Sequence, residues 1–205
     1  MLLQADLNMP LSAGGAIVAG AQLIHINKIG SGGNEDAGKR YMQQSSAMTF
    51  GGMFGWENKA WKTSINFNRI TKKGRYLMPR EWGRDPFYTF LPRERNEGLG
   101  DVHAYVLMAN YQPKQKNWQA MAAAGYYNLP LTTNYRLNKY GMPSYYQLLA
   151  DVRYNFSGIL KGTSVRLIYL YKGNMEDGLT NQKNIIHKVN MQHVNLIVDY
   201  WFGKK

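Results

Sequence analysis

The chain has 205 residues, enough for one large β domain, and it has no cysteine, which excludes disulfides and Cys-based metal sites or nucleophiles. Its 25 Lys and Arg outnumber its 13 Asp and Glu, giving a net charge of +12. The expected partners are therefore anionic: nucleic acid, lipid headgroups or solutes in a basic pore. A mean hydropathy of -0.45 and the absence of any apolar run near 18 residues exclude a membrane-spanning helix. They do not exclude spanning β-strands, which are only half apolar.

The first half of the chain shows three segments with strand character. Residues 13–29 are rich in Gly, Ala and branched apolar residues and predict a strand. Residues 46–56 and 60–70 alternate apolar and small or polar residues, the period of a β-strand. Trp56 and Trp61 flank the tight turn between them, where an aromatic girdle at a membrane surface would lie.

The second half repeats this pattern after a long irregular segment, 71–100. Strands are predicted at 102–111 and 118–127, around a short turn that Tyr111 and Trp118 bracket. Further strands are predicted at 146–156 and 165–172, again with one apolar and one polar face. Polar loops cover 130–144 and 173–188.

The last predicted strand, 189–202, alternates most clearly. One of its faces is apolar and becomes aromatic towards the chain end, and it consists of Val194, Leu196, Val198, Tyr200 and Phe202. This pattern resembles the C-terminal signal read by the machinery that inserts outer-membrane barrels, although residues 203–205 follow it. The side chains that we expect to face the membrane or to form its aromatic girdle are Trp56, Trp61, Tyr111, Trp118, Tyr154, Phe156, Tyr169, Tyr171, Tyr200 and Phe202.

The connections between the predicted strands alternate between long and short. Bacterial membrane barrels have short periplasmic turns and long extracellular loops in this order. We therefore predict an all-β fold, an antiparallel transmembrane β-barrel with about eight strands present. The start of the chain lacks the positive segment of a secretory signal, so the chain is expected either to be cytoplasmic or to be part of a longer protein.

The segment 74–98 is rich in Arg, Pro and aromatic residues, and it contains the run Arg-Glu-Trp-Gly-Arg-Asp-Pro at 80–86. With the surrounding strands, over 38–202, it resembles the OprD-type outer-membrane porin family in its Bacteroidetes-like form. The resemblance implies a barrel of about eighteen strands, often assembled as a trimer, of which this chain is the C-terminal part. It also implies an outer-membrane location in a Gram-negative bacterium, contact with outer-membrane lipid, and passive diffusion of small anionic or zwitterionic solutes that carry a carboxylate.

Basic residues on the pore wall would guide such a solute, because a guanidinium is permanently charged and its planar fork fits a carboxylate. The candidates are Arg75, Arg80, Arg84, Arg93 and Arg95 on the long loop, which is expected to enter the pore, and Lys62, Arg153 and Arg166 on strands. The alternative is that the loop arginines pair with Glu81, Asp85, Glu94 and Glu97 to hold the loop together. On the strands, Asp151 and Arg153 share a face and are expected to neutralise each other.

Two other functions fit parts of the sequence. A closed eight-strand barrel could serve as an adhesin or anchor, since its interior would be filled by side chains. A soluble basic β protein could bind nucleic acid, which basic and aromatic residues recognise together. The four His share no ligand spacing and no catalytic motif is present, so we expect no metal, no cofactor and no enzyme activity.

Overall fold

The computed structural model describes residues 1–12, 14–78, 85–114 and 117–202. These residues form nine strands, which pair in sequence order as one antiparallel sheet. The strands are β1 (Leu2–Pro10), β2 (Ala16–Asn27), β3 (Ser46–Glu57), β4 (Trp61–Ile70), β5 (Val102–Tyr111), β6 (Trp118–Asn128), β7 (Tyr145–Asn155), β8 (Thr163–Asn174) and β9 (Met191–Tyr200). Single turns of 3-10 helix occur at Ala37–Lys39, Gly158–Leu160 and Gln182–Asn184.

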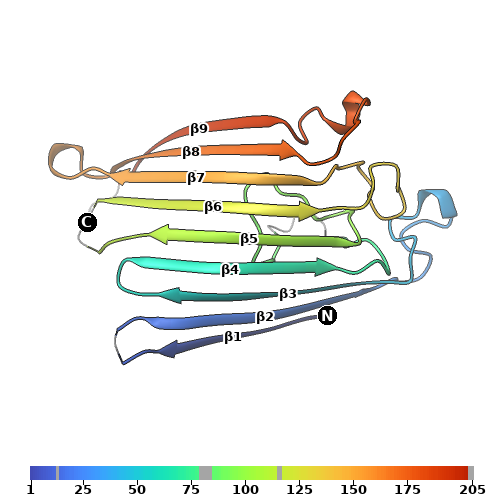
Figure 1. Cartoon of the computed structure of the whole chain (residues 1–205), viewed down its shortest axis with the longest axis horizontal. Coiled ribbons are helices and arrows are strands. Elements are labelled where there is room, and N and C mark those ends of the chain that lie inside the picture. Colours follow the sequence, from blue (N-terminus) through green and yellow to red (C-terminus); the bar gives the residue numbers. More distant parts are fainter. Residues whose placement is uncertain (13, 79–84, 115–116, 203–205) are drawn as a thin grey trace.

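The connections alternate as the sequence predicts. Short turns join β1 to β2, β3 to β4, β5 to β6 and β7 to β8 at one end of the sheet, and long loops join the other pairs at the opposite end (Figure 1). We call these the short-turn end and the long-loop end. The structure confirms the predicted antiparallel strands, about eight in number, and adds β1, which the sequence analysis did not identify. Leu3, Leu7 and Met9 in β1 do alternate with polar residues, and this signal could have revealed the strand.

The outer face of the sheet is apolar and exposed, the reverse of a soluble protein. Leu107 on β5, Leu167 on β8 and Leu196 on β9 are 56%, 48% and 68% exposed. An apolar surface of this size marks contact with another apolar phase or with a partner. In the part of the chain that the structure describes, no helix is long and apolar enough to cross a membrane.

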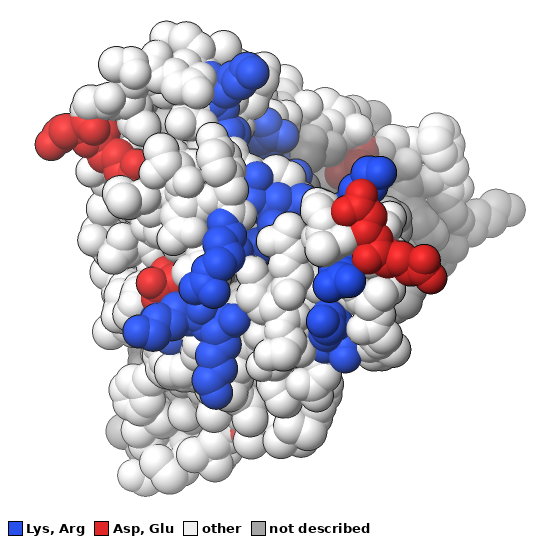
Figure 2. All heavy atoms as spheres, turned by 90° about the vertical axis from the view of Figure 1, so that its right-hand side faces the viewer, with Lys and Arg blue, Asp and Glu red and all other residues white. Residues whose placement is uncertain are grey.

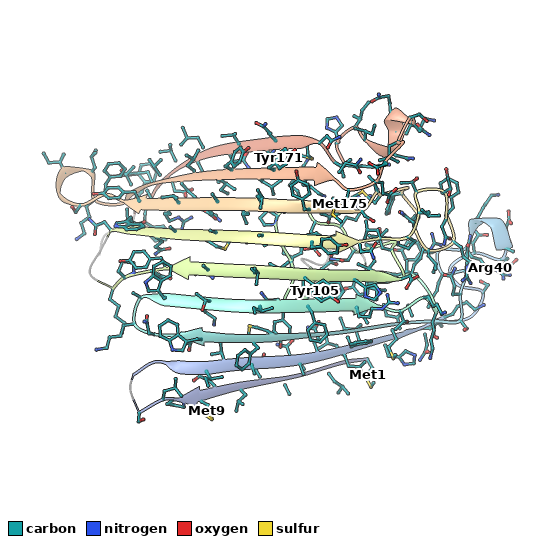
Figure 3. The ribbon with its side chains drawn as sticks, viewed as in Figure 1. Met1, Met9, Arg40, Tyr105, Tyr171 and Met175 are labelled. Atoms are coloured by element: carbon teal, nitrogen blue, oxygen red, sulfur yellow. The ribbon has the colours of Figure 1, made fainter. Side chains whose placement is uncertain are left out.

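Two belts of aromatic side chains border this apolar band. At the short-turn end, Tyr111 lies between Trp61 and Trp118, with ring centroids 4.6 Å and 4.9 Å apart. Tyr154 and Phe156, and Tyr200 and Phe202, continue this belt in edge-to-face pairs. Tyr169 and Tyr171 lie instead towards the long-loop end, in a second belt that the sequence analysis did not identify. This belt also contains Tyr105, paired with Tyr126, and Tyr146, paired with Tyr171. Figure 3 labels Tyr105 and Tyr171.

The hydrophobic core lies on the inner face, between the sheet and the β4–β5 loop, which runs behind the sheet in Figure 1. Tyr76 and Phe87 of the loop pack with ring centroids 4.8 Å apart. Tyr127 of β6 and Tyr145 of β7 stack at 4.6 Å. The loop is therefore a packed element and not a disordered connection, as its aromatic content predicts.

The sheet is open at both edges. Among the described residues β1 pairs only with β2 and β9 only with β8, so the closed eight-strand barrel that we considered is not what the chain forms. Figure 3 shows Met1 at the long-loop end and Met9 at the short-turn end of β1. Because nine strands alternate in direction, β9 runs the same way as β1.

Candidate functional site: a basic hollow on the inner face

The β4–β5 loop crosses the inner face and is fixed to the sheet on both sides. On one side, Gln22 of β2 donates from Nε2 to the carbonyl oxygen of Pro86 (3.0 Å), and Tyr88 donates from Oη to Asp6 of β1 (2.6 Å). Gly20 permits this approach, since a Cβ there would collide with the Tyr88 hydroxyl. On the other side, three wall residues donate to loop carbonyls: Tyr127 to Thr89 (3.0 Å), Gln147 to Pro92 (2.8 Å) and Lys172 to Arg93 (3.3 Å).

Glu94 lies at the centre of the docked loop, 5% exposed. Its carboxyl group accepts hydrogen bonds from Leu91 N (2.8 Å), Asn96 Nδ2 (2.8 Å) and Tyr127 Oη (3.3 Å). Burial raises the pKa of Glu94 to about 8, because it penalises the charged form more than the hydrogen bonds from Asn96 and Leu91 favour it. The protonation of this one group is therefore coupled to the docking of the loop.

A hollow of about 750 Å³ opens beside this loop, between the long loops and β8. Figure 2, viewed from the long-loop end, shows Lys and Arg side chains gathered in a central band. The residues that line the hollow are Asp85, Phe90, Arg93, Glu94, Arg95, Tyr140, Met142, Lys172, Ile186, His187 and Lys188. Four of them are basic and two, Asp85 and Glu94, are acidic, so the excess of basic residues favours anions.

Three of the four cations are positioned by rings and carbonyl groups. Lys172 Nζ lies 3.7 Å from the ring centroid of Tyr145, and Arg95 lies 4.0 Å from that of Tyr140. Lys188 Nζ donates to the carbonyl oxygen of Tyr140 (2.5 Å), and burial together with the charge of Arg95 lowers the pKa of Lys188. Within the described ranges, none of the four cations forms an ion pair with a carboxylate.

Arg93 adopts a left-handed backbone conformation with φ 68°, and so does His187 with φ 59°. Non-glycine residues rarely adopt this conformation, and such strain clusters at binding sites. The Lys172 ammonium, which holds the Arg93 carbonyl, helps to maintain it. The side chains of both residues line the hollow.

The remaining candidate residues lie elsewhere. Arg166 pairs with Asp151 across adjacent strands (2.8 Å from Nε to Oδ1), so the expected pair of Asp151 with Arg153 is not the one formed. Arg153 lies 4.0 Å from Asp199 of β9. Lys62 pairs with Glu57 at the short-turn end (3.2 Å).

On the loop, Arg75 is 6% exposed and does not line the hollow. Arg80, Glu81 and Arg84 lie outside the described residues. Glu97 accepts hydrogen bonds from Tyr41 and Tyr140 and pairs with Lys139, not with an arginine. Of the six predicted basic residues that the structure describes, Arg93 and Arg95 line the hollow.

Sequence reasoning missed Lys172, Lys188, Tyr140 and His187. Lys172 does lie on the polar side of an alternating strand, and this signal could have identified it. A second hollow, of about 580 Å³ on the outer face, is lined without any charged residue and offers no chemistry. No group of His, Asp and Glu among the described residues could hold a metal ion.

No model of a protein family matches the sequence, and no curated protein matches it. Solved structures do match. The outer-membrane protein OprD from Pseudomonas aeruginosa superposes with a TM-score of 0.71 at 12% identity, covering 97% of this chain and 50% of that one. The fold is that of half an OprD-type porin.

Two relatives of OprD agree. OccK5 (OpdH) of Pseudomonas aeruginosa gives a TM-score of 0.69 at 15% identity and covers 97% of this chain and 49% of its own. OccAB2 of Acinetobacter baumannii gives a TM-score of 0.67 at 13% identity, and the match covers 97% of this chain and 46% of that one. This chain therefore spans about half the length of the OprD-type structures that it matches, and the likeness to an OprD-type porin predicted from the sequence is confirmed at the level of fold.

Proposed function

We propose that the chain forms the C-terminal half of an outer-membrane channel of the OprD type, through which small carboxylate-bearing solutes diffuse passively along a basic wall. The observation that carries this proposal is the hollow in which Arg93, Arg95, Lys172 and Lys188 converge on the inner face without carboxylate partners among the described residues. The β4–β5 loop that builds it folds inward and narrows the passage.

The open edges support closure by a complementary set of strands. An edge in lipid leaves backbone groups unpaired, each of which costs several kcal/mol or more. Two copies of this chain, related by an axis normal to the membrane, would bring β9 of one beside β1 of the other in parallel. A complementary unit whose first and last strands run from the short-turn end to the long-loop end closes both seams antiparallel. If this complementary unit also has nine strands, the two units together form a barrel of about eighteen strands.

The restrained cations suit a channel better than a tight binding site. Three of the four, Arg95, Lys172 and Lys188, are held by a ring or a carbonyl oxygen and not by a carboxylate, so their charge is not cancelled by an ion pair. Conduction requires several weak sites in sequence, because a single strong site would retain the solute. The channel has no need of catalytic groups, and the proposal contains no enzyme step.

The outer surface supports a membrane location. The apolar band between two aromatic belts is the surface that a bilayer requires of a barrel. The outward row Val194, Leu196, Val198 and Tyr200 on β9 is 54% to 68% exposed, as a segment read by the insertion machinery must be. Recognition by that machinery and assembly into a trimer remain predictions. A nucleic-acid partner is disfavoured because the cations of the hollow face inward and the exposed wall is apolar.

Planar-bilayer recordings of protein extracted from membranes test the proposal. We expect conductance steps that favour anions over cations and that shrink when a dicarboxylate enters the channel. The double substitution Arg93→Gln and Arg95→Gln should reduce the anion-to-cation permeability ratio roughly tenfold, because it removes half of the unneutralised charge in a narrow throat. The matched control, Lys72→Gln with Lys183→Gln, removes the same charge from exposed positions at the long-loop end and should change the ratio little.

Two results would overturn the proposal. One is recovery of the chain in the supernatant without detergent. The other is a channel whose selectivity is equal in the Arg93 and Arg95 variant, the control and the unaltered protein.

A further inference from the structure

Three of the long loops meet at one buried carboxylate, that of Glu97 in the β4–β5 loop, which is 5% exposed. Its Oε1 accepts a hydrogen bond from the Tyr41 hydroxyl of the β2–β3 loop (3.0 Å). Its Oε2 accepts one from the Tyr140 hydroxyl of the β6–β7 loop (2.6 Å). Lys139, also of the β6–β7 loop, places its Nζ 3.7 Å from Oε1 and supplies the opposite charge. One side chain therefore joins three loops that are far apart in the sequence.

Backbone contacts bring the β6–β7 loop to this carboxylate. The Lys139 N–H donates to the Gly98 carbonyl oxygen (3.1 Å), and the Gly100 N–H donates to the Leu137 carbonyl oxygen (2.7 Å). Gly98 has φ 83°, and a Cβ there would lie 2.7 Å from the Tyr140 ring, so glycine allows the close approach. The two loops are thus paired along their backbones beside the Tyr140 hydroxyl.

A buried side chain closes the turn that carries Tyr140. Asn138 donates from Nδ2 to the carbonyl oxygens of Pro130 (2.8 Å) and Met142 (2.7 Å), and its Oδ1 accepts from the Met142 N–H (2.8 Å). Asn138 is 0% exposed, so these hydrogen bonds are shielded from water. The position of Tyr140 is therefore set by the loop backbone at one side and by the hydroxyl contact with Glu97 at the other.

Tyr140 in turn holds two of the four cations of the basic hollow. Its ring centroid lies 4.0 Å from the Arg95 guanidinium, and its carbonyl oxygen accepts a hydrogen bond from Lys188 Nζ (2.5 Å). All three residues line the hollow, whereas Glu97 does not. A cation over an aromatic face is attracted to the ring and keeps its charge. A displacement of Tyr140 would therefore move the charges that an incoming anion meets.

We propose that Tyr140 positions Arg95 and Lys188 for anion selectivity, and that its hydrogen bond to Glu97 holds it in place. Glu97 acts as a latch between the three loops and does not contact the solute. The inference rests on the proposed channel function, and it adds a residue that determines selectivity without carrying a charge.

The substitution Tyr140→Phe tests this role because it removes a hydroxyl and no charge. In planar bilayers the anion-to-cation permeability ratio should fall roughly threefold, since the variant displaces one of the two arginines whose joint removal should lower it about tenfold. In detergent, the Lys139 and Gly100 amides should exchange roughly tenfold faster, because a hydrogen bond to a charged group is lost. The matched control, Tyr135→Phe, removes a hydroxyl from an exposed tyrosine of the same loop and should change neither quantity.

The substitution Tyr41→Phe separates positioning of the cations from a general clamp on the loops. It removes the other tyrosine hydrogen bond to Glu97, and Tyr41 does not line the hollow. We expect the permeability ratio to stay at its unaltered value. An equal fall in Tyr41→Phe and Tyr140→Phe would overturn the proposal, because the ratio would then depend only on how tightly the loops are joined.

The recordings also distinguish this role from the channel itself. An unchanged ratio in Tyr140→Phe, beside a lowered ratio in the Arg93 and Arg95 variant, would overturn the positioning role and leave the channel standing. Unchanged exchange of the Lys139 and Gly100 amides would overturn the latch. A lack of anion preference in the unaltered protein would overturn the channel and the positioning role together.

Discussion

Glu94→Gln is the substitution that best tests how the inner loop is held. The carboxyl group is buried under the loop, where it accepts hydrogen bonds from Leu91, Asn96 and Tyr127. Glutamine has almost the same shape, stays neutral at all pH values and can still accept through Oε1. The substitution therefore removes the ionisation and leaves most of the packing in place.

The magnitude follows from the displaced pKa. The pKa of Glu94 lies at about 8 in the docked loop against 4.5 for a free glutamate, and burial is the main cause. A raised pKa means that the docked state is most stable at low pH and loses stability as pH rises from 4.5 to 8. The loss is about 1.4 kcal/mol per pH unit in that window and at most about 5 kcal/mol in total. The glutamine variant should show no such loss.

Hydrogen exchange of the loop amides measures how the stability of the docked loop depends on pH. The N–H groups of Tyr76, Leu91 and Gly98 are held inside the loop, and their protection reports docking. Comparing the variant with the unaltered protein at each pH cancels the intrinsic pH dependence of exchange. We expect the two to converge near pH 5 and the variant to be better protected at pH 9. Glu35→Gln, an exposed glutamate at the long-loop end, serves as the control and should follow the unaltered protein.

Protection that falls with pH to the same extent in the Glu94 variant and in the unaltered protein would refute the argument. It would mean that the carboxylate is accommodated in the docked loop and that the hydrogen bonds from Asn96 and Leu91 outweigh the cost of burial. Uniformly weaker protection at every pH would also refute it, because the glutamine would then act by disrupting the packing.

Two further substitutions test other parts of the inner face. Gly20→Ala should push the Tyr88 hydroxyl away from the wall while the sheet stays intact. The docking of residues 85–90 should weaken by about 2 kcal/mol, the strength of a hydrogen bond to a charged group. Faster amide hydrogen exchange confined to that segment is the expected result, and unchanged exchange contradicts it. Asp151→Asn removes the carboxylate that neutralises Arg166, so the anion-to-cation permeability ratio should rise several-fold in bilayer recordings; a fall would contradict the placement of Arg166 on the channel wall.

The strands could be predicted because their signal is local. Alternation in β4 and β9 is visible in ten residues, and the structure places Ile65 and Leu196 on the outer face as that alternation requires. Aromatic residues beside a short turn, such as Trp61 and Trp118, are likewise next to the feature that explains them. The order of loop lengths then identifies the architecture without any long-range information.

The basic hollow could not be predicted in the same way. Lys172 and Lys188 are separated from Arg93 and Arg95 by 77 to 95 residues, and only the register of β6 to β8 and the docking of the loop bring them together. The sequence showed that arginines were abundant in the loop. It did not show that Arg75 would be buried away from the hollow or that Asp151 would pair with Arg166.

The partners of the cations determine where the positive field is strong. Near the short-turn end, Arg166, Arg153 and Lys62 each lie within 4.0 Å of a carboxylate, which cancels much of their field. Near the long-loop end, Arg95 is restrained by the ring of Tyr140, which fixes its position and leaves its charge available to an anion, whereas the Lys172 ammonium is buried against the ring of Tyr145. Conversion of Tyr140 or Tyr145 into an acid should therefore reduce the attraction for anions more than removal of an arginine that is already paired. In the proposed channel, the unpaired cations lie at the level of the docked loop, and a weak attraction for anions at that level would influence which solutes pass.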